Sequence, residues 1–456
     1  MQNVYDNVVD AIGHTPLVRI NRLGRDTGAT FYAKLEYLNP GSSVKDRIAV
    51  QIIEDAERSG ELKPGGTVVE CTSGNTGMGL AMVGAARGYH TILVMPDKVS
   101  DEKIKALRAF GAKVITTPTA VPPEDPRSYY QVARRVAETT PSAFFANQYQ
   151  NMSNPEAHFR TTGPEVWEQM GEKLDAVVVA TGTGGTLTGI ARYIKPKKPS
   201  VKYVLVDPVG SIFYEYIKTG KSPKILKTYK VEGFGEDFIP DTIDLSCVDE
   251  VIQVSDKECF STARELTRKE GIFGGGSCGG AMAGAIKYAQ AHPECRTLVV
   301  LMPDSGSRYL SKVYDDAWLR QNGFLEEELA GRVEDLLHKR PQKVIVAQAA
   351  DSVRDVLGVM KMHGISQVPV MEGERLVGML SESGLLGAML SDPSSAHKSA
   401  GALAEPTYEV VEPSAPVSRL SDVVAQGKVA LIIDSGRLQG VVTKIDLIEY
   451  LAASNR

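Results

Sequence analysis

Up to about residue 320, short apolar runs alternate with longer amphipathic stretches, and this alternation constrains the fold more than any other feature of the sequence. Apolar runs of about 4–8 residues indicate strands, and apolar residues three and four apart indicate helices. A strand followed by a helix, repeated many times, predicts an α/β fold with mostly parallel sheets and helices on both faces. Ligands of such sheets bind at the carboxyl ends of the strands. The expected strands include Thr67–Glu70, Thr91–Met95, Lys113–Ile115, Ala176–Ala180, Tyr203–Asp207 and Thr297–Met302, and the expected helices include Val44–Arg58, Thr76–Arg87, Asp101–Phe110 and Asp256–Glu270.

Length and composition narrow the class of protein. A chain of 456 residues exceeds one compact core and predicts two or three domains. The formal net charge of −5 argues against a nucleic-acid binder, which would carry a basic face. No apolar run is long enough for a membrane span, and the first residues lack a signal-peptide pattern. The five cysteines are scattered without a Cys-x-x-Cys pair, so we expect reduced thiols in a cytoplasm and no metal site.

Three short segments carry the chemistry. Residues 41–47 read Gly-Ser-Ser-Val-Lys-Asp-Arg, residues 72–77 read Thr-Ser-Gly-Asn-Thr-Gly, and residues 181–186 read Thr-Gly-Thr-Gly-Gly-Thr. They offer an amine that can form an imine, a polar turn for a carboxylate, and a glycine loop whose N–H groups can converge on a phosphate. Pyridoxal phosphate (PLP) needs such a set. A dinucleotide fingerprint would require glycine at position 187, which is leucine, whereas a plain strand–helix turn remains an alternative for the glycine loop.

These segments resemble the signatures of the fold-type II PLP enzymes of the cysteine synthase and cystathionine β-synthase family. Three further segments share the resemblance: Ile12–Leu17, Asn147–Asn151 and Gly275–Gly280. The match extends from about residue 5 to about residue 325. It implies two α/β subdomains with mostly parallel sheets and PLP as the cofactor.

The resemblance also implies roles for individual residues. Lys45 would hold the PLP aldehyde and act as general base, although most lysines at a helix start lie on the surface. Asn75 would contact the ring hydroxyl, and Ser277 would face the ring nitrogen. The phosphate would be bound by Gly182, Thr183, Gly184, Gly185 and Thr186, and the substrate carboxylate by Thr72, Ser73, Thr76 and Gln148. Asp46 and Arg47 are expected to form local salt bridges rather than to catalyse.

Ser277 has a chemical consequence. A neutral hydroxyl does not hold the pyridine nitrogen protonated as an aspartate would, so the ring becomes a weaker electron sink. A weaker sink favours prompt expulsion of a β-leaving group over transamination. The alternative is a serine that merely belongs to the glycine-rich turn around Gly274–Gly276.

Within the family, the resemblance implies a β-replacement lyase. The preferred reading is condensation of L-serine with L-homocysteine to L-cystathionine, with hydrogen sulfide production from cysteine as a related reaction. Similarity to that branch rests on residues 77–89, on residues 304–318 and on the C-terminal module. The first alternative is a cysteine synthase that uses O-acetylserine and sulfide. The second is a nucleotide sensor whose PLP domain is catalytically silent.

Two features depart from the animal members of the family. Many eukaryotic members have tyrosine at the position of Glu236, so this carboxylate either orients the amine of homocysteine or is a solvated loop residue. The chain is also expected to lack the N-terminal haem segment and the Cys-x-x-Cys motif of animal enzymes, as in a haem-less bacterial type.

The last third of the chain contains an internal repeat. Glu374–Ser381 aligns with Gly436–Thr443, and each copy continues into an apolar helix. Two strand–turn–strand–helix copies resemble a tandem pair of CBS domains. Ligand-binding CBS domains often carry Ser/Thr-x-x-Asp; Thr443 and Asp446 keep this pattern, whereas Gly384 replaces the aspartate in the first copy. We therefore expect at most one strong adenosyl site, with purely structural pairing of subunits as the alternative.

The expected domain limits follow from these patterns. They are 1–323 for the catalytic domain, 324–341 for a linker that includes a helix over Leu325–Leu337, 342–398 for the first CBS domain and 402–456 for the second. The family resemblance implies a homodimer of catalytic domains, and the CBS modules could join dimers into tetramers.

Overall fold

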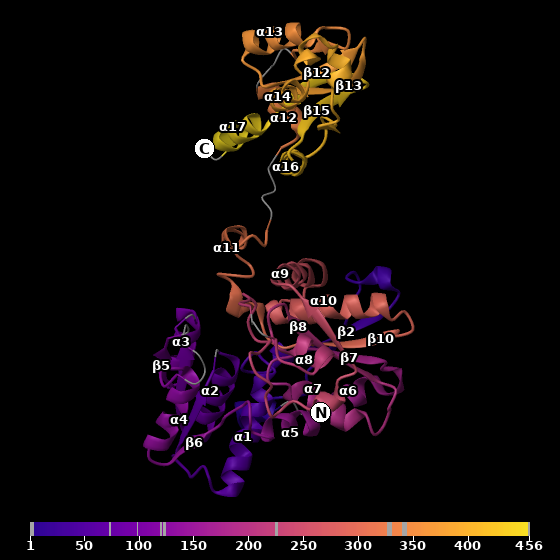
Figure 1. The fold of residues 1–456 in the computed structure, drawn as a ribbon. Helices are drawn as coiled ribbons and strands as arrows, with labels where there is room; N and C mark the ends of the chain where they lie inside the picture. Colours follow the sequence, from indigo (N-terminus) through magenta and orange to yellow (C-terminus); the bar gives the residue numbers. More distant parts are fainter. Residues whose placement is uncertain are drawn as a thin grey trace. The chain divides into compact units, whose positions relative to one another are not determined.

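The computed structural model describes residues 4–72, 74–97, 99–118, 121, 125–223, 227–325, 331–339 and 344–454. The chain divides into two compact units, Met1–Leu325 and Glu326–Arg456 (Figure 1). The domain limits expected from the sequence stay predictions. The connecting helix expected over Leu325–Leu337 falls partly outside the described residues, and its described part is α12 (Val333–Lys339).

The larger sheet of the first unit has six strands in the order β1-β2-β10-β7-β8-β9. All neighbours are parallel except β1 and β2, which are antiparallel. The strands are β1 (Leu17–Arg19), β2 (Thr30–Leu35), β7 (Ala176–Ala180), β8 (Lys202–Pro208), β9 (Glu250–Val254) and β10 (Thr297–Met302). The expected strands at β7 and β10 have the observed limits, and β8 extends the expected strand by one residue at each end.

Both faces of this sheet are buried. Because successive side chains of a strand point to opposite sides, each strand contributes to a core on either face. Val178 and Val204 belong to the core that packs under α10 (Gly276–Ala291). Val177 and Leu205 belong to the core on the other face, which includes α7 (Gly185–Ile194). The near-continuous apolar runs of the sequence therefore correspond to strands covered on both faces.

The smaller sheet of the first unit is fully parallel, in the order β5-β4-β3-β6. Helix α1 (Lys45–Ser59) and helix α2 (Asn75–Arg87) pack against each other on one side, and α4 (Tyr129–Thr139) covers the other. The strands are β3 (Thr67–Cys71), β4 (His90–Pro96), β5 (Lys113–Thr117) and β6 (Ala143–Phe145), and α3 spans Asp101–Ala109. The helix expected over Asp256–Glu270 is α9 (Asp256–Glu265) followed by a wider π-helical turn, Leu266–Glu270.

The second unit consists of two similar halves. Each half has an antiparallel hairpin, β12–β13 (Gln367–Glu372, Arg375–Ser381) or β15–β16 (Val429–Asp434, Arg437–Val442), and a parallel third strand, β11 (Ala347–Gln348) or β14 (Tyr408–Val411). The register of the hairpins shifts at Val370/Met371 and at Ile432/Ile433, which are the same position of the repeat. The halves share a small core that contains Met379 and Leu431. The strand–turn–strand–helix repeat is therefore confirmed, with α14 (Glu382–Ser391) and α17 (Lys444–Ser454) as its helices.

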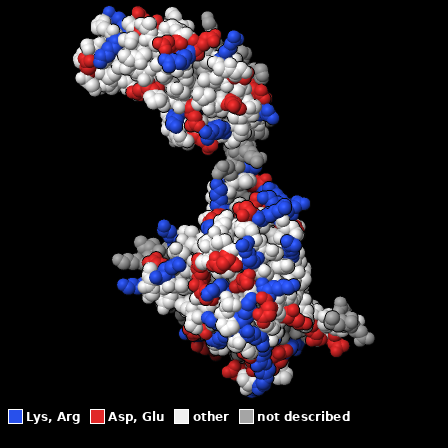
Figure 2. Space-filling model, turned by 90° about the vertical axis from the view of Figure 1, so that its right-hand side faces the viewer, with Lys and Arg blue, Asp and Glu red and all other residues white. Residues whose placement is uncertain are grey.

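Two surface properties bear on function. Figure 2 shows lysine and arginine interspersed with aspartate and glutamate over the visible face, without a broad region of one sign. Among the described residues, none of the helices has both the length and the apolar character that crossing a membrane would require.

Candidate active site

Lys45 is the first residue of α1, is half-buried and lines a pocket. Burial lowers the pKa of its amine to about 8, while the charges of Glu236 and Asp304 act in the opposite direction. The amine donates no hydrogen bond to any of the described residues. Lys45 is therefore a lysine with a substantial neutral fraction near physiological pH, as a group that attacks an aldehyde must be.

A buried ion network fixes the helix that carries Lys45. Arg47, in the first turn of α1, pairs with Glu36 (Nε–Oε2 2.6 Å) and with Glu165 (Nη1–Oε1 2.7 Å). Lys34 also pairs with Glu165 (Nζ–Oε2 2.7 Å). Two cations and two carboxylates therefore balance, as burial requires. The expectation of local salt bridges is wrong: Arg47 reaches another element 118 residues away, and Asp46 accepts a hydrogen bond from the Gly41 amide instead.

The glycine loop connects β7 to α7. Gly184 has φ +81°, and a Cβ at this position would collide with Ile243, so only glycine fits. The N–H groups of residues 182–187 donate no hydrogen bond to the described parts of the protein. Converging free N–H groups at the start of a ten-residue helix form an anion site, so the loop fits a phosphate.

Two side chains of helix α5 (Ser153–Arg160) contact the hydroxyl groups of Thr183 and Thr186 in the glycine loop. Asn154 donates from Nδ2 to Thr183 Oγ1 (2.9 Å), and the Nε2 of His158 lies 3.1 Å from Thr186 Oγ1. His158 is fully buried, which lowers the pKa of its imidazole well below the ordinary value and keeps the ring neutral. Neither supporting residue was singled out from the sequence.

One pocket brings the predicted cofactor residues together. Lys45, Asn75, Ser277 and the glycine loop all line it, the loop contributing Gly182, Thr183, Gly184 and Thr186. They come from α1, α2, α10 and the β7–α7 turn, which meet at the carboxyl ends of the strands. The neighbouring Gly185 is packed against Asn154.

Three of the predicted carboxylate-binding residues are buried: Thr72 and Thr76 in the asparagine loop (residues 72–77), and Gln148 beside it. Thr76 Oγ1 donates to Gln148 Oε1 (2.6 Å), and Gln148 Nε2 donates to Glu70 (3.4 Å) and to the Cys71 carbonyl (3.3 Å). The Thr72 hydroxyl accepts from the amide of Gly74 (3.0 Å). These side chains shape the loop, and substrate contact by them stays a prediction. Ser73 lies outside the described residues.

Asp304 is the principal site residue that sequence reasoning missed. It lies two residues after β10 ends at Met302, and it is fully buried. It accepts hydrogen bonds from Ser277 Oγ (3.2 Å), Asn75 Nδ2 (2.8 Å) and Tyr309 OH (2.5 Å). Its place at the carboxyl end of a central strand is the signal that could have identified it.

Glu236 lies beside Gly182, a lining residue of this pocket, in the segment between residue 220 and β9. Its Oε1 lies 3.4 Å from the Cβ position of an alanine at residue 182. Burial, and to a lesser extent the charge of Asp237, raise the pKa of this carboxyl to about 8, against the opposing charge of Lys45. The interpretation of Glu236 as a solvated loop carboxylate is therefore not supported by its position.

The second unit contains one preserved Thr-x-x-Asp arrangement. Thr443 donates to Asp446 Oδ2 from both its hydroxyl (2.6 Å) and its backbone amide (2.8 Å). In the first half, the Ser381 hydroxyl accepts from the Gly384 amide (3.1 Å), and the carboxylate beside residue 384 belongs to Glu405, whose Oε2 lies 3.5 Å from the Cβ position of an alanine there. The two halves are therefore chemically unequal.

Comparison with known proteins agrees with this site. The model of the family "Pyridoxal-phosphate dependent enzyme" matches residues 8–304, and the CBS domain model matches residues 333–391 and 400–453. The fold and site thus define a PLP-dependent enzyme of fold type II with a C-terminal CBS pair, and the predicted cofactor is confirmed.

The relatives specify the family. Cystathionine beta-synthase of Oryctolagus cuniculus is 38% identical over 99% of this chain and 85% of that protein. Cystathionine beta-synthase of Saccharomyces cerevisiae is 35% identical over 98% of each chain. The chain belongs to the cystathionine β-synthase family of PLP-dependent enzymes.

Solved structures resemble the catalytic unit. A hydrogen sulfide-producing enzyme from Fusobacterium nucleatum is 37% identical, with a TM-score of 0.62 over 67% of this chain and 100% of that one. O-ureido-L-serine synthase is also 37% identical, with a TM-score of 0.63 over 70% of this chain and 99% of that one.

Proposed function

We propose that the protein condenses L-serine with L-homocysteine to L-cystathionine by β-replacement. The observation that carries the proposal is one pocket in which the amine of Lys45 faces a free-amide phosphate cradle. The family membership adds the substrate pair, because the relatives are named for the synthesis of cystathionine.

The chain's own residues provide binding and proton transfer. Bound PLP supplies an aldehyde for covalent attachment and a ring that accepts electrons from the substrate's α-carbon. The amides of residues 182–187 hold the phosphate, and Asn75 and Ser277 hold the ring. With PLP and substrate bound, the Lys45 amine would be the group positioned to remove the substrate's α-proton. The same amine then protonates the departing β-hydroxyl as water.

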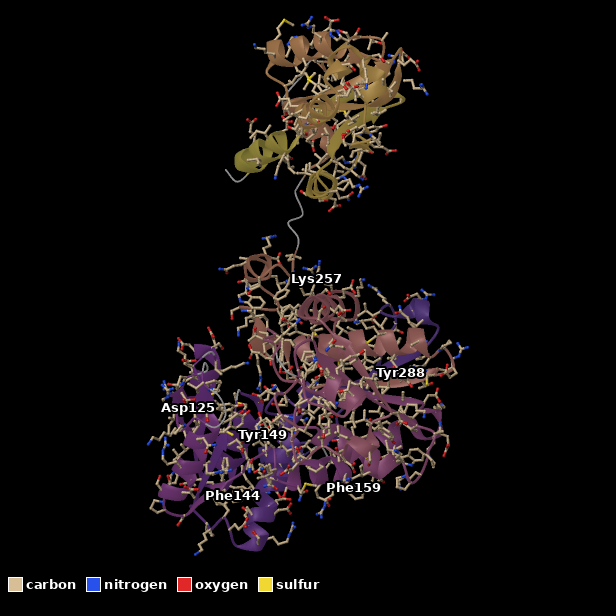
Figure 3. All side chains as sticks on the ribbon, in the orientation of Figure 1. Asp125, Phe144, Tyr149, Phe159, Lys257 and Tyr288 are labelled. Atoms are coloured by element: carbon tan, nitrogen blue, oxygen red, sulfur yellow. The ribbon has the colours of Figure 1, made fainter. Side chains whose placement is uncertain are left out.

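Glu236 supports recognition of the second substrate. Its carboxyl lies at the pocket beside Gly182, and its nearest aromatic surroundings include Tyr149, which packs edge-on against Phe238 (ring centroids 5.2 Å; Tyr149 is labelled in Figure 3). An ammonium group entering here would stabilise the ionised form of this carboxyl, whose pKa is otherwise raised to about 8, because opposite charges attract strongly where little water screens them. We therefore assign Glu236 to the amine of homocysteine.

A paired turnover assay tests the function. One arm offers L-serine with L-homocysteine and the other offers O-acetyl-L-serine with sulfide, and kcat/KM is compared between arms. A clear preference for serine and homocysteine supports cystathionine synthesis. Preference for O-acetylserine assigns the protein to the cysteine synthases, and silence in both arms with PLP bound supports the sensor alternative. Cysteine as first substrate reports hydrogen sulfide release.

The CBS pair is proposed to bind one adenosyl ligand through Thr443 and Asp446. Ribose hydroxyls need an acidic acceptor, and only the second half retains one at this position among the described residues. Calorimetry with S-adenosylmethionine should give one site per chain, and Asp446→Asn should abolish it; no heat in the wild type would leave subunit pairing as the role. We also propose that the protein is a homodimer or a homotetramer and that it acts in the cytoplasm.

A further inference from the structure

Asp304 connects the two sides of the cofactor pocket. Its carboxylate accepts hydrogen bonds from Ser277 Oγ of α10 and from Asn75 Nδ2 of α2. A third hydrogen bond comes from the hydroxyl of Tyr309. The three partners each bring an N–H or O–H group that can donate to this carboxyl. Its backbone carbonyl accepts from the Gly275 amide (3.1 Å), which fixes it against the turn that carries Ser277.

The direction of the Ser277 hydrogen bond has a chemical consequence. A hydroxyl has one proton and two lone pairs. With its proton donated to Asp304, the Ser277 oxygen offers only lone pairs to the pocket that it lines. A lone pair stabilises a protonated ring nitrogen, whereas a hydroxyl proton would stabilise the unprotonated one.

We propose that Asp304 is a positioning residue that acts through the Ser277 hydroxyl to raise the proton affinity of the cofactor's ring nitrogen. The proposal rests on the assignment of Ser277 to that nitrogen. It modifies the interpretation of Ser277 as an isolated neutral contact, because a buried negative charge stands one hydrogen bond behind the serine.

Other charged groups around Asp304 come from several elements. Lys45 of α1 is close enough for Asp304 to affect its amine, and Glu236 bears on the same amine. Arg308, in the turn Gly306–Tyr309, donates to the Asn75 amide oxygen and to the Gly41 carbonyl. None of these side chains donates to or accepts from Ser277 among the described contacts. Asp304 is thus the charged group in direct contact with the serine.

The experiment reads the ring nitrogen directly. Full-length holoenzyme is prepared with ¹⁵N-labelled PLP, and the ¹⁵N resonance is followed with pH in the wild type, Asp304→Asn, Ser277→Ala and the double variant. Protonation moves this resonance upfield. Asp304→Asn should move it downfield and lower the nitrogen's apparent pKa by on the order of one unit, as loss of an adjacent charge does. In the Ser277→Ala background the same change should have no further effect.

Controls separate the possible failures. Asp207→Asn removes another fully buried carboxylate, at the end of β8, that does not touch Ser277, and should leave the resonance unchanged. If Asp304→Asn does not fold, Asp304→Ser provides the uncharged acceptor. No shift in Asp304→Asn with a shift in Ser277→Ala overturns the role of Asp304 alone. No shift in either variant overturns the assignment of Ser277, and an equal shift of Asp304→Asn in both backgrounds overturns action through the serine.

Discussion

Lys45 illustrates how one residue type takes its chemistry from its surroundings. A lysine at a helix start is ordinarily solvated and protonated, but enclosure by the pocket lowers the pKa of Lys45 to about 8. The neutral amine is the form that attacks an aldehyde, so the local environment of this lysine determines how fast the enzyme acquires its cofactor.

Attachment of PLP should therefore depend on pH. When the protein freed of PLP is mixed with added cofactor, the rate of covalent attachment should rise about tenfold per pH unit below 8 and level off above it. The appearance of the imine absorbance measures this rate. A rate that continues to rise to pH 10 would show that the amine titrates as an ordinary lysine.

Glu70 should make stability fall as pH rises. Burial raises the pKa of its carboxyl from 4.5 to about 8, so the folded protein holds a proton that the unfolded chain has lost between these values. The contribution of the neutral form is complete below pH 4.5 and is lost as pH rises through 8, at up to about 1.4 kcal/mol per pH unit. Glu70→Gln cannot ionise, so its stability should fall less over this window.

Both proteins are unfolded with urea at several pH values, and tryptophan fluorescence gives the midpoints. Trp167 and Trp318 are the two tryptophans of the sequence, and both lie in the first unit with Glu70. Parallel pH profiles for the wild type and Glu70→Gln would contradict the buried, neutral state of this carboxyl.

At the scale of elements, the position of α1 depends on the buried ion network at its first turn. Its first turn carries Lys45, and Arg47 two residues later is tied to Glu36 and Glu165. Charges this deeply buried contribute little net stability as a pair, but loss of one partner leaves the others uncompensated. The network thus fixes where the helix begins.

Arg47→Met should destabilise the first unit by about 3–5 kcal/mol, because Glu165 would keep only Lys34 as an ion-pair partner and Glu36 would keep none among the described residues. Urea unfolding followed by tryptophan fluorescence measures the loss. Arg58→Met on the same helix is the matched control: Arg58 is 63% exposed, pairs with Asp55, and should cost less than about 1 kcal/mol. Equal losses of unfolding free energy in the two variants would contradict the role of the buried network in stabilising the first unit.

Elements were largely predictable because their signals are local. The apolar runs at β7 and β10 have the observed limits, and the loops after β3 and β7 were identified because strand ends carry ligands. Partners that meet through tertiary folding were not predictable. His158 and Glu165 lie in distant segments, and nothing in the residues beside them marks their contacts, whereas the position of Asp304 after β10 could have been noticed but its partners could not. The short strands β1 and β6 were also missed, since three residues give no measurable periodicity.

At the scale of the whole molecule, each unit has hydrophobic cores of its own. The cores built around α10 and α7 use residues before 326, and those around β12 and β15 use residues after it. Separate cores allow separate unfolding transitions, because each unit buries its own apolar surface.

Unfolding of the full chain should therefore proceed in two steps. Tryptophan fluorescence reports the first unit alone, whereas calorimetry reports both. We expect calorimetry to show two heat-absorption peaks, of which one coincides with the fluorescence transition. A single peak that coincides with the fluorescence change would mean that the units unfold as one cooperative body.

The inequality of the two halves of the second unit has a consequence for control. Glycine stands at residue 384 where the other half has Asp446, so the Thr-x-x-Asp pattern offers an adenosyl ligand one aspartate per chain. One saturable site gives a hyperbolic dose–response with a Hill coefficient of about one. Any sigmoidal response of this enzyme to such an effector would have to originate in the association of several chains, and its Hill coefficient would set a lower limit on their number.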